Sequence, residues 1–294
     1  MTILVTGSSG FIGFHISREL LQNNISVYGI DNFGSLNGDT LKNKRTKILK
    51  KLKKFEFSKI DICDFKKIEN IVKKKNIKTI LHLAAHTGVR NSIANSKKYL
   101  ESNINGFYNI LEISRKYKIK HLIFASSSSV YGDAKEFPLK EFNNTDFSSS
   151  FYAATKKSNE VLAYSYSNIF KVPITALRFF TVYGEYGRQD MAVYKFTKLI
   201  YNNKKINLYN YGNHKRDFTY ITDIIETIKR LIKKPSKKQI PFNLFNVGRG
   251  KAESVFKIIK LIEINLKKKS KILKTNKKIG DVTKTHADIK LLKK

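Results

Sequence analysis

The feature that most constrains the fold is a glycine-rich segment near the start of the chain. Gly7, Gly10 and Gly13 follow the short apolar stretch 3–6, and a helical pattern runs on from them. Glycines allow a tight turn and let a pyrophosphate approach the N-terminus of the helix, where free N–H groups favour anions. This context predicts a dinucleotide site, with the alternative that the turn only caps a helix.

A carboxylate ends the second apolar stretch, where a dinucleotide would place its adenosine ribose. Asp31 follows residues 25–30, and no arginine comes directly after it. A carboxylate there accepts hydrogen bonds from the ribose hydroxyls and repels a 2′-phosphate, so the sequence favours NAD over NADP. Asp61 and Ile62 follow the third apolar stretch and would meet the adenine, although Asp61 could equally cap the next helix.

Apolar stretches alternate with helical patterns along the first 180 residues. Expected strands cover 3–6, 25–30, 55–57, 79–84, 121–125 and 174–178, and expected helices cover 11–23, part of 35–54, 64–75, 96–117 and 151–170. Continuous apolar strands that alternate with helices predict an α/β fold with a doubly wound parallel sheet. Ligands of such a sheet bind at the carboxyl ends of its strands.

The alternation loosens after residue 180, which we interpret as a smaller mixed α/β lobe. Helices are expected near 190–203, 222–234 and 253–267, with a short strand at 243–247. We predict an NAD-binding domain made of 1–178 and about 219–248, and a substrate-binding lobe made of about 179–218 and 249–294.

A serine run and a Tyr-Lys pair suggest catalysis of an alcohol oxidation. Serines 126–129 end one expected strand, and Tyr152 and Lys156 lie four residues apart in an expected helix. Four residues make about one helical turn, so the phenol and the ammonium share a face and the positive charge favours the phenolate. A phenolate can take a proton from an alcohol whose oxygen also receives a serine hydrogen bond. The alternative is an ordinary amphipathic helix beside a polar loop.

Composition excludes several other classes of protein. The net charge is +34, but lysines are spread over every segment, so we expect solvated faces and no nucleic-acid partner. No apolar run approaches the roughly 18 residues of a membrane span, and no signal peptide is expected. The single cysteine, Cys63, is typical of a reducing compartment, here the cytoplasm.

Together these motifs resemble the extended short-chain dehydrogenase/reductases over nearly the whole chain. The segments 84–90, 152–160, 177–184, 187–192 and 215–220 are long strings that look like those of UDP-glucuronate 4-epimerases. The resemblance implies a Rossmann domain and places Ser127, Tyr152 and Lys156 as catalytic residues.

The resemblance, together with the motifs above, also implies two sets of binding residues. The NAD contacts are Gly7, Gly10, Phe11, Ile12, Gly13, Asp31, Asn32, Asp61, Ile62, Leu83, Ala84, Ala85, Asn103, Tyr152, Lys156 and Phe180. The substrate contacts are Thr87, Arg90, Ser128, Ser129, Thr181, Arg188, Arg216 and Asp281. Arginine forks suit carboxylates and phosphates, although any one of these arginines could be a surface ion pair. No metal site is assigned.

The implied activity is C4 epimerisation of UDP-glucuronate to UDP-galacturonate through a 4-keto sugar, with NAD kept bound and the product used for polysaccharide synthesis. The alternatives are a UDP-glucose/galactose 4-epimerase, an inactive protein that binds NAD or a nucleotide sugar, and, more distantly, a basic nucleic-acid binder. Relatives that dimerise do so through the helices here expected at 96–117 and 151–170, so a homodimer is expected.

The C-terminal region departs from the family pattern. The family motif has proline before the equivalent of Gly280, where this chain has Ile279, which bears on Lys278 and Asp281 as nucleotide contacts. Family members usually continue past this region into a closing helix, so we expect either a shortened lobe or a fragment.

Overall fold

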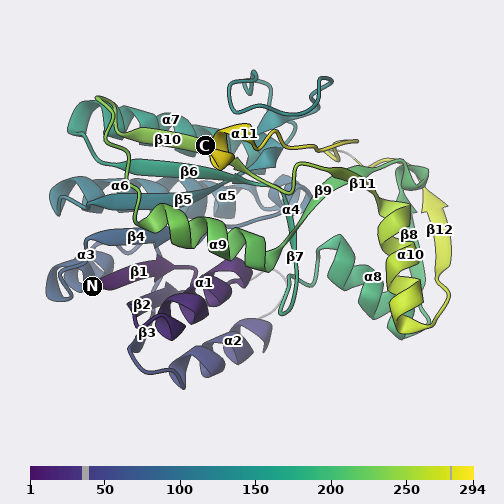
Figure 1. Cartoon of the computed structure of the whole chain (residues 1–294), viewed down its shortest axis with the longest axis horizontal. Helices are drawn as coiled ribbons and strands as arrows, with labels where there is room; N and C mark the ends of the chain where they lie inside the picture. The colour runs from purple at the N-terminus through teal and green to yellow at the C-terminus, as the bar shows by residue number, and fades with distance from the viewer. Residues whose placement is uncertain (35–39, 279) are drawn as a thin grey trace.

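The computed structural model describes residues 1–34, 40–278 and 280–294; Ile279 and the beginning of the polar stretch expected before the lysine-rich helix lie outside the described residues. A central sheet of seven parallel strands has the order β10-β6-β5-β4-β1-β2-β3 (Figure 1). Its strands are β1 (Thr2–Thr6), β2 (Ser26–Asp31), β3 (Phe55–Lys59), β4 (Thr79–His82), β5 (His121–Ser127), β6 (Ile174–Phe179) and β10 (Phe242–Val247).

Helices cover both faces of this sheet, as the continuous apolar strands predict. One face carries α1 (Phe11–Gln22), α2 (Thr40–Lys50) and α9 (Ile221–Ile232). The opposite face carries α3 (Phe65–Lys74), α6 (Gly106–Lys116) and α7 (Phe151–Phe170). Alternate residues of a strand serve opposite faces, so Ile3 and Val5 pack in the first core whereas Leu4 packs in the second. The doubly wound α/β fold is confirmed.

The expected helix 96–117 is not one continuous α-helix. A short helix, α5 (Ser96–Tyr99), leads through a π-helical turn (Leu100–Asn105) into α6, and α4 (Val89–Ala94) precedes it without having been expected. The wider turn holds Asn103 inside the protein, where its amide oxygen accepts a hydrogen bond from His86 N at 2.8 Å. π-Helical turns frequently occur at functional sites, and apolar periodicity does not reveal them.

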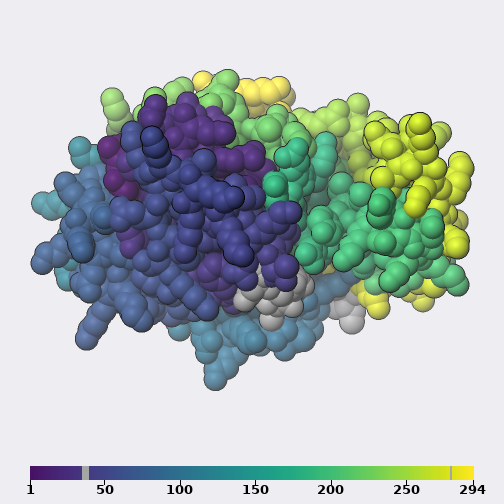
Figure 2. Space-filling view, turned by 90° about the horizontal axis from the view of Figure 1, so that it is seen from below, coloured from purple at the N-terminus to yellow at the C-terminus, as the bar shows by residue number. Residues whose placement is uncertain are grey.

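The remaining elements build a smaller lobe with two short sheets. One sheet has the order β11-β9-β7 and the other pairs β12 with β8. The elements are β7 (Thr181–Tyr183), α8 (Ala192–Tyr201), β8 (Lys205–Tyr209), β9 (Lys215–Tyr220), β11 (Ala252–Ser254), α10 (Val255–Leu266) and β12 (Lys271–Thr275), whereas the last helix, α11 (Lys290–Lys293), packs against β10 of the large sheet. Figure 2 shows the green and yellow residues of this lobe at one end of the molecule, beside the purple and blue N-terminal part. These five short strands were not expected.

Between its two passages through the smaller lobe, the chain returns to the large sheet with α9 and β10. β10 pairs in parallel with β6, from Phe242 opposite Ile174 to Val247 opposite Phe179, and α9 packs against α1. Within the described ranges, no helix combines the length and the apolar character that a membrane crossing needs.

Candidate active site

A cavity of about 970 Å³ lies at the carboxyl ends of the parallel strands and extends to the smaller lobe. It is lined by every predicted site residue except Asp61 and Asn103. Strands β1 and β4 are neighbours at its centre, where the strand order reverses direction along the sheet. Such a switch point is where open parallel sheets bind ligands.

The glycine turn between β1 and α1 is shaped for close approach of main chain. Gly7 has φ +69°, and a Cβ added there would lie 2.7 Å from Ala84 N. A Cβ on Gly13 would lie 2.1 Å from Gly7 O, so only glycine fits. Helix α1 has no side-chain cap, and its first residues line the cavity. This end of the cavity therefore fits a pyrophosphate, whose oxygens would accept hydrogen bonds from the free N–H groups.

Asp31 is buried at the end of β2 and is held by three donors. Its carboxylate accepts hydrogen bonds from Ser9 N at 3.2 Å and Phe33 N at 2.9 Å, and an ion pair joins it to Lys42 Nζ at 2.9 Å. Asn32, the next residue, also lines the cavity. The position fits an adenosine ribose, with Lys42 as an additional cation that the motif did not reveal.

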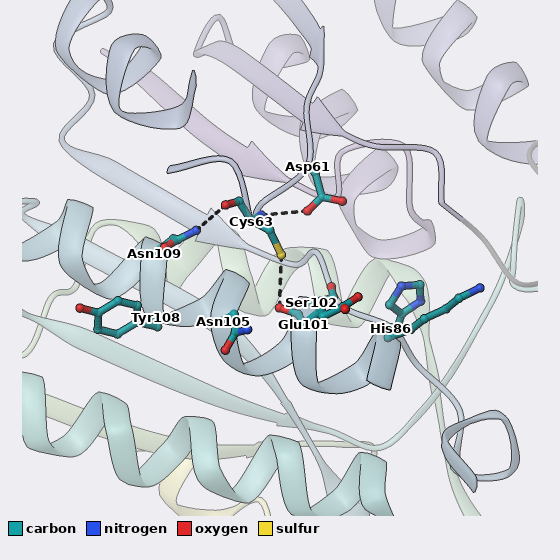
Figure 3. Close-up of a pocket in the computed structure, with 9 residues that line it drawn as sticks. Asp61, Cys63, His86, Glu101, Ser102, Asn105, Tyr108 and Asn109 are labelled. Atoms are coloured by element: carbon teal, nitrogen blue, oxygen red, sulfur yellow. Dashed lines mark hydrogen bonds between the residues drawn. The ribbon is translucent and has the colours of Figure 1, made fainter. Parts of the chain in front are cut away.

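Asp61 lies in an adjoining cavity of about 430 Å³, drawn in Figure 3. Its Oδ1 accepts a hydrogen bond from Cys63 N at 2.8 Å, and its Oδ2 accepts one from Asn32 at 2.7 Å. Burial alone would raise the pKa of Asp61, but these hydrogen bonds outweigh it and lower the pKa. Since Ile62 and His86 line the main cavity, Asp61 lies at the outer edge of the predicted adenine site.

Asn103 acts on the cavity only indirectly. Its side chain is buried behind the lining and bonds to both main-chain groups of His86, with Nδ2 donating to His86 O at 3.0 Å. Nδ2 also donates to Thr155 Oγ1 at 3.1 Å. Asn103 thereby joins the loop after β4 to α7, and the cofactor contact expected of it stays a prediction.

Lys156 is buried, and its ammonium is already engaged. Its Nζ donates to Ala125 O at 2.8 Å, on the strand that ends in the serines. Burial lowers the pKa of Lys156 to about 8, while the negative charge of Glu160 partly opposes that shift. The ammonium therefore anchors α7 to the end of β5.

Tyr152 is half-buried on the first turn of α7 and lines the cavity. Burial raises its pKa, and the Ser127 hydroxyl and the positive charge of Arg188 partly oppose that rise. Arg188 supplies a positive charge that favours the phenolate in this geometry. The effect expected of Lys156 stays a prediction, and its ammonium is held by a main-chain carbonyl.

Local hydrogen bonds set the positions of the serine run and of α7. Ser127 Oγ accepts from Ser129 N at 3.2 Å and from Ser129 Oγ at 2.9 Å. Ser150 caps α7 by accepting from Ala153 N at 3.1 Å. Farther along the helix, Glu160 forms a buried ion pair with Arg178 at 2.7 Å.

Arginines line the part of the cavity toward the smaller lobe. Arg90 forms an ion pair with Asp281 and lies 4.4 Å from the centre of the Tyr209 ring. Arg188 pairs with Asp190 at 2.6 Å.

Arg216 completes this set, but it has no carboxylate partner among the described residues. It donates to Val282 O at 2.6 Å and to Thr283 O at 3.0 Å. Burial lowers its pKa to about 10, with Asp281 opposing the shift. Lys278 does not line the cavity, although its Nζ lies 5.4 Å from the centre of the Tyr209 ring.

Hydroxyl groups line the same cavity as these arginines and Tyr152. They belong to Ser128, Ser129, Thr181 and Thr87. Three positive side chains and several hydroxyls in one cavity fit an anionic ligand with a polar ring.

Several lining residues were missed by reasoning from the sequence. They include Lys42, Arg45, Asn207 and Tyr209. Lys42 and Arg45 look like members of a solvated lysine-rich helix, and their partners are distant in sequence. The aromatic Tyr209 at the end of a short strand carries no motif that would single it out.

Comparison with known proteins identifies the family. Residues 3–248 match the model of the NAD dependent epimerase/dehydratase family. An uncharacterized protein of Methanocaldococcus jannaschii is 45% identical over 289 residues, which are 98% of this chain and 87% of that protein. A UDP-glucuronate 4-epimerase of Thermodesulfobacterium geofontis is 40% identical over 293 residues, 99% of this chain and 88% of that protein.

A solved structure agrees closely in fold. The crystal structure of UDP-glucuronic acid 4-epimerase from Bacillus cereus, in complex with UDP-glucuronic acid and NAD, matches with a TM-score of 0.91 and 33% identity. The match covers 99% of this chain and 91% of that one. From its sequence and its fold alike, the chain belongs to the NAD-dependent epimerase/dehydratase family.

Proposed function

We propose that this protein is an NAD-dependent C4 epimerase that interconverts UDP-glucuronate and UDP-galacturonate. The observation that carries this proposal is the meeting of Ser127, Tyr152 and Lys156 with the glycine turn in one cavity, opposite a wall of arginines and hydroxyls. The printed functions of the relatives and of the structural neighbour support the same substrate.

The large sheet would bind the cofactor and the smaller lobe would bind the substrate. The first turn of α1 would hold the pyrophosphate, Asp31 the adenosine ribose, and Lys156 the nicotinamide ribose. When bound, NAD would accept the hydride from sugar C4 and return it to the other face of that carbon.

The side chains of this protein would move the proton that accompanies the hydride. Tyr152 takes the proton of the C4 hydroxyl as the C4–H bond breaks, and returns it to the same oxygen after the 4-keto sugar has turned over in the cavity. The Ser127 hydroxyl hydrogen-bonds that oxygen in both half-reactions. The net change is an inversion at C4, so no oxidant or reductant is consumed.

The residues after Ser127 favour a uronate and disfavour elimination. Ser128 and Ser129 are hydroxyls, whereas related dehydratases and decarboxylases have an acidic residue just after the catalytic hydroxyl. Hydroxyls donate hydrogen bonds to a carboxylate without the repulsion that an acidic side chain would cause. Thr181 and the Arg188 guanidinium line the same cavity and also suit a carboxylate, so a UDP-glucose/galactose 4-epimerase, which would bind a neutral sugar, is only the second candidate.

The test is incubation of the purified protein with UDP-glucuronate, and separately with UDP-glucose, without added NAD. We expect formation of the C4 epimer from UDP-glucuronate only, detected by chromatography against both standards. Conversion of UDP-glucose alone would establish the second candidate, and conversion of neither would contradict an epimerase.

We also propose a homodimer formed through α6 and α7, which pack against each other. Their outer surfaces expose Tyr108, Val161 and Tyr164, each about half accessible. Two such helix pairs would bury these side chains in a four-helix arrangement. Light scattering should give the mass of a dimer for the native protein and of a monomer for Val161→Asp.

Finally, we propose that the protein works in the cytoplasm and supplies polysaccharide synthesis. Cys63 is the only cysteine, and its thiol is free, as is typical of a reducing compartment. Fractionation of cells should recover the epimerase activity with the cytosol.

A further inference from the structure

Arg45 is a buried arginine between the two ligand sites. It lies on α2, is 4% exposed, and lines the cavity. Its Nη1 donates to Ser9 O at 3.0 Å, inside the glycine turn, and its Nη2 donates to Tyr186 O and, at 3.5 Å, to Gly187 O. One guanidinium thus connects the turn that would bind pyrophosphate with the loop that leads into Arg188.

The charge of Arg45 is poorly compensated within the protein. Among the described residues its hydrogen bonds go only to main-chain carbonyls, and its buried Nε has no partner. Burial lowers the pKa of Arg45 to about 10, with Asp31 opposing the shift and Arg188 adding to it. A buried cation without a paired anion is costly, so an anionic ligand nearby would stabilise this arrangement.

The loop that Arg45 holds is docked on the cofactor side of the molecule. His15, on α1, shares a hydrogen bond of 2.9 Å with Glu185 O, and the Tyr186 ring lies 5.1 Å from the Phe14 ring. The next charged residue along this loop is Arg188, whose positive charge acts on Tyr152. A movement of α1 or α2 would therefore be transmitted through this loop to Arg188, which is a predicted substrate contact.

We propose that Arg45 is a positioning residue that couples NAD binding to substrate binding. The inference rests on the proposed function only in taking NAD and a UDP sugar as the two ligands. Pyrophosphate at the N-terminus of α1 supplies negative charge near Arg45, which stabilises the buried guanidinium where it bridges Ser9 and the 184–188 loop. That loop then holds Arg188 toward the sugar nucleotide. Coupling between two sites is reciprocal in affinity, so the sugar nucleotide raises the affinity for NAD, which we expect to act through slower release of NAD.

The test measures the release of NAD from loaded protein in a parent that carries Tyr152→Phe, so that no turnover occurs. Each protein is reloaded with NAD and diluted into an enzymatic assay for free NAD, with and without UDP-glucuronate. In the parent we expect UDP-glucuronate to slow release about 10-fold, the middle of the usual range for coupled sites. With Arg45→Met added, release is faster and the effect of UDP-glucuronate falls below about 2-fold.

Two further variants separate coupling from folding. Arg45→Lys keeps the charge but cannot bridge three carbonyls, so we expect slower release than from the Met variant and still no effect of UDP-glucuronate. Lys47→Met, on the exposed side of α2, should behave as the parent. A full effect of UDP-glucuronate in either Arg45 variant would overturn the inference, as would a parent that binds both ligands without coupling. A parent that binds no NAD would instead overturn the proposed function.

Discussion

Two walls of the cavity differ in how they are built. The proposed cofactor wall, formed by the glycine turn and the ends of β2, β4 and β5, consists largely of main chain, whereas the proposed substrate wall, with Arg90, Arg188 and Arg216, consists of arginines that already have partners. On the first wall, Gly7 N donates to Ile30 O and Gly10 N donates to Gly7 O, each at 2.8 Å. On the second, Arg90 pairs with Asp281 and Arg188 pairs with Asp190. The first wall is therefore preformed, while on the second Arg90 and Arg188 would have to exchange carboxylates of the protein for anionic groups of a ligand.

This difference means that the same kind of substitution should act differently on the two walls. Changes on the cofactor wall should affect stability and NAD content, because they distort main chain that is already in place. Changes on the substrate wall should affect KM, because the exchange of ionic partners contributes to binding of substrate and transition state alike. Tyr152 lies where the walls meet and should affect kcat alone.

The largest effect is expected for Tyr152→Phe, at the junction of the walls. Removal of the phenol oxygen removes the proposed base, which should lower kcat about 10²- to 10⁴-fold. NAD content should stay unchanged, as measured by absorbance after denaturation. Tyr201→Phe, at the exposed end of α8, is the matched control. Near-normal turnover of Tyr152→Phe would remove this residue from the mechanism.

The second largest effect is expected for Lys156, on the cofactor wall, which should make the free energy of unfolding depend on pH. Its pKa is about 8 in the folded protein, below the ordinary 10.5, so the folded chain loses this proton first. Between these two pH values the unfolded chain holds more protons, and stability rises with pH. The free energy of unfolding of wild type minus that of Lys156→Met should therefore rise across this range, by up to about 3 kcal/mol in denaturant titrations. A difference that is flat with pH would show that burial does not destabilise the ammonium.

A smaller effect than that of Lys156 is expected for Gly13→Ala in the glycine turn, which should lower the free energy of unfolding. Alanine normally stabilises a helix relative to glycine by about 1 kcal/mol. Here the added Cβ would meet Gly7 O at 2.1 Å, and overpacking costs about 1–3 kcal/mol. We expect a lower Tm and little retained NAD. A variant that is more stable than wild type would mean that the turn is not preformed.

The smallest effect is expected for Arg90→Met on the substrate wall. Loss of a charge-assisted contact should raise the KM for UDP-glucuronate about 10-fold, with kcat and Tm nearly unchanged. Arg230→Met is a matched control, since Arg230 pairs with Glu226 on the exposed side of α9. If Arg90→Met instead lowered NAD content or Tm, the contrast between the walls would fail.

Most of the cofactor wall could be predicted because its residues are close in sequence to the strands that carry them. Each strand end follows a continuous apolar stretch, so the places of Gly7, Asp31 and Ser127 at one edge follow from a parallel sheet. Tyr152 and Lys156 share a face by helical periodicity alone. What remained open was the partner of each group, such as Lys42 for Asp31 and Ala125 O for Lys156.

The smaller lobe was harder to predict for a physical reason. Its strands lack a continuous apolar run, as in β9 (KRDFTY) and β12 (KILKT), so they do not stand out from the surrounding polar sequence. The π-helical turn at Leu100–Asn105 was missed because it leaves the apolar pattern of a long helix intact. Its consequence, the buried Asn103, appears only when the loop after β4 is beside it.

The order of residues alone determined the alternating α/β fold, the glycine turn after the first strand and the shared helix face of Tyr152 and Lys156, since each depends on spacing within one helix or one strand–turn–helix unit. Only the tertiary structure decided which cation acts on Tyr152 and which groups connect the two ligand sites. Arg45 shows why: its carbonyl partners are 36 and 141 residues away, in Ser9 and Tyr186. Electrostatic and hydrogen-bonding partners depend on distance in space, and folding brings together groups that no local pattern relates.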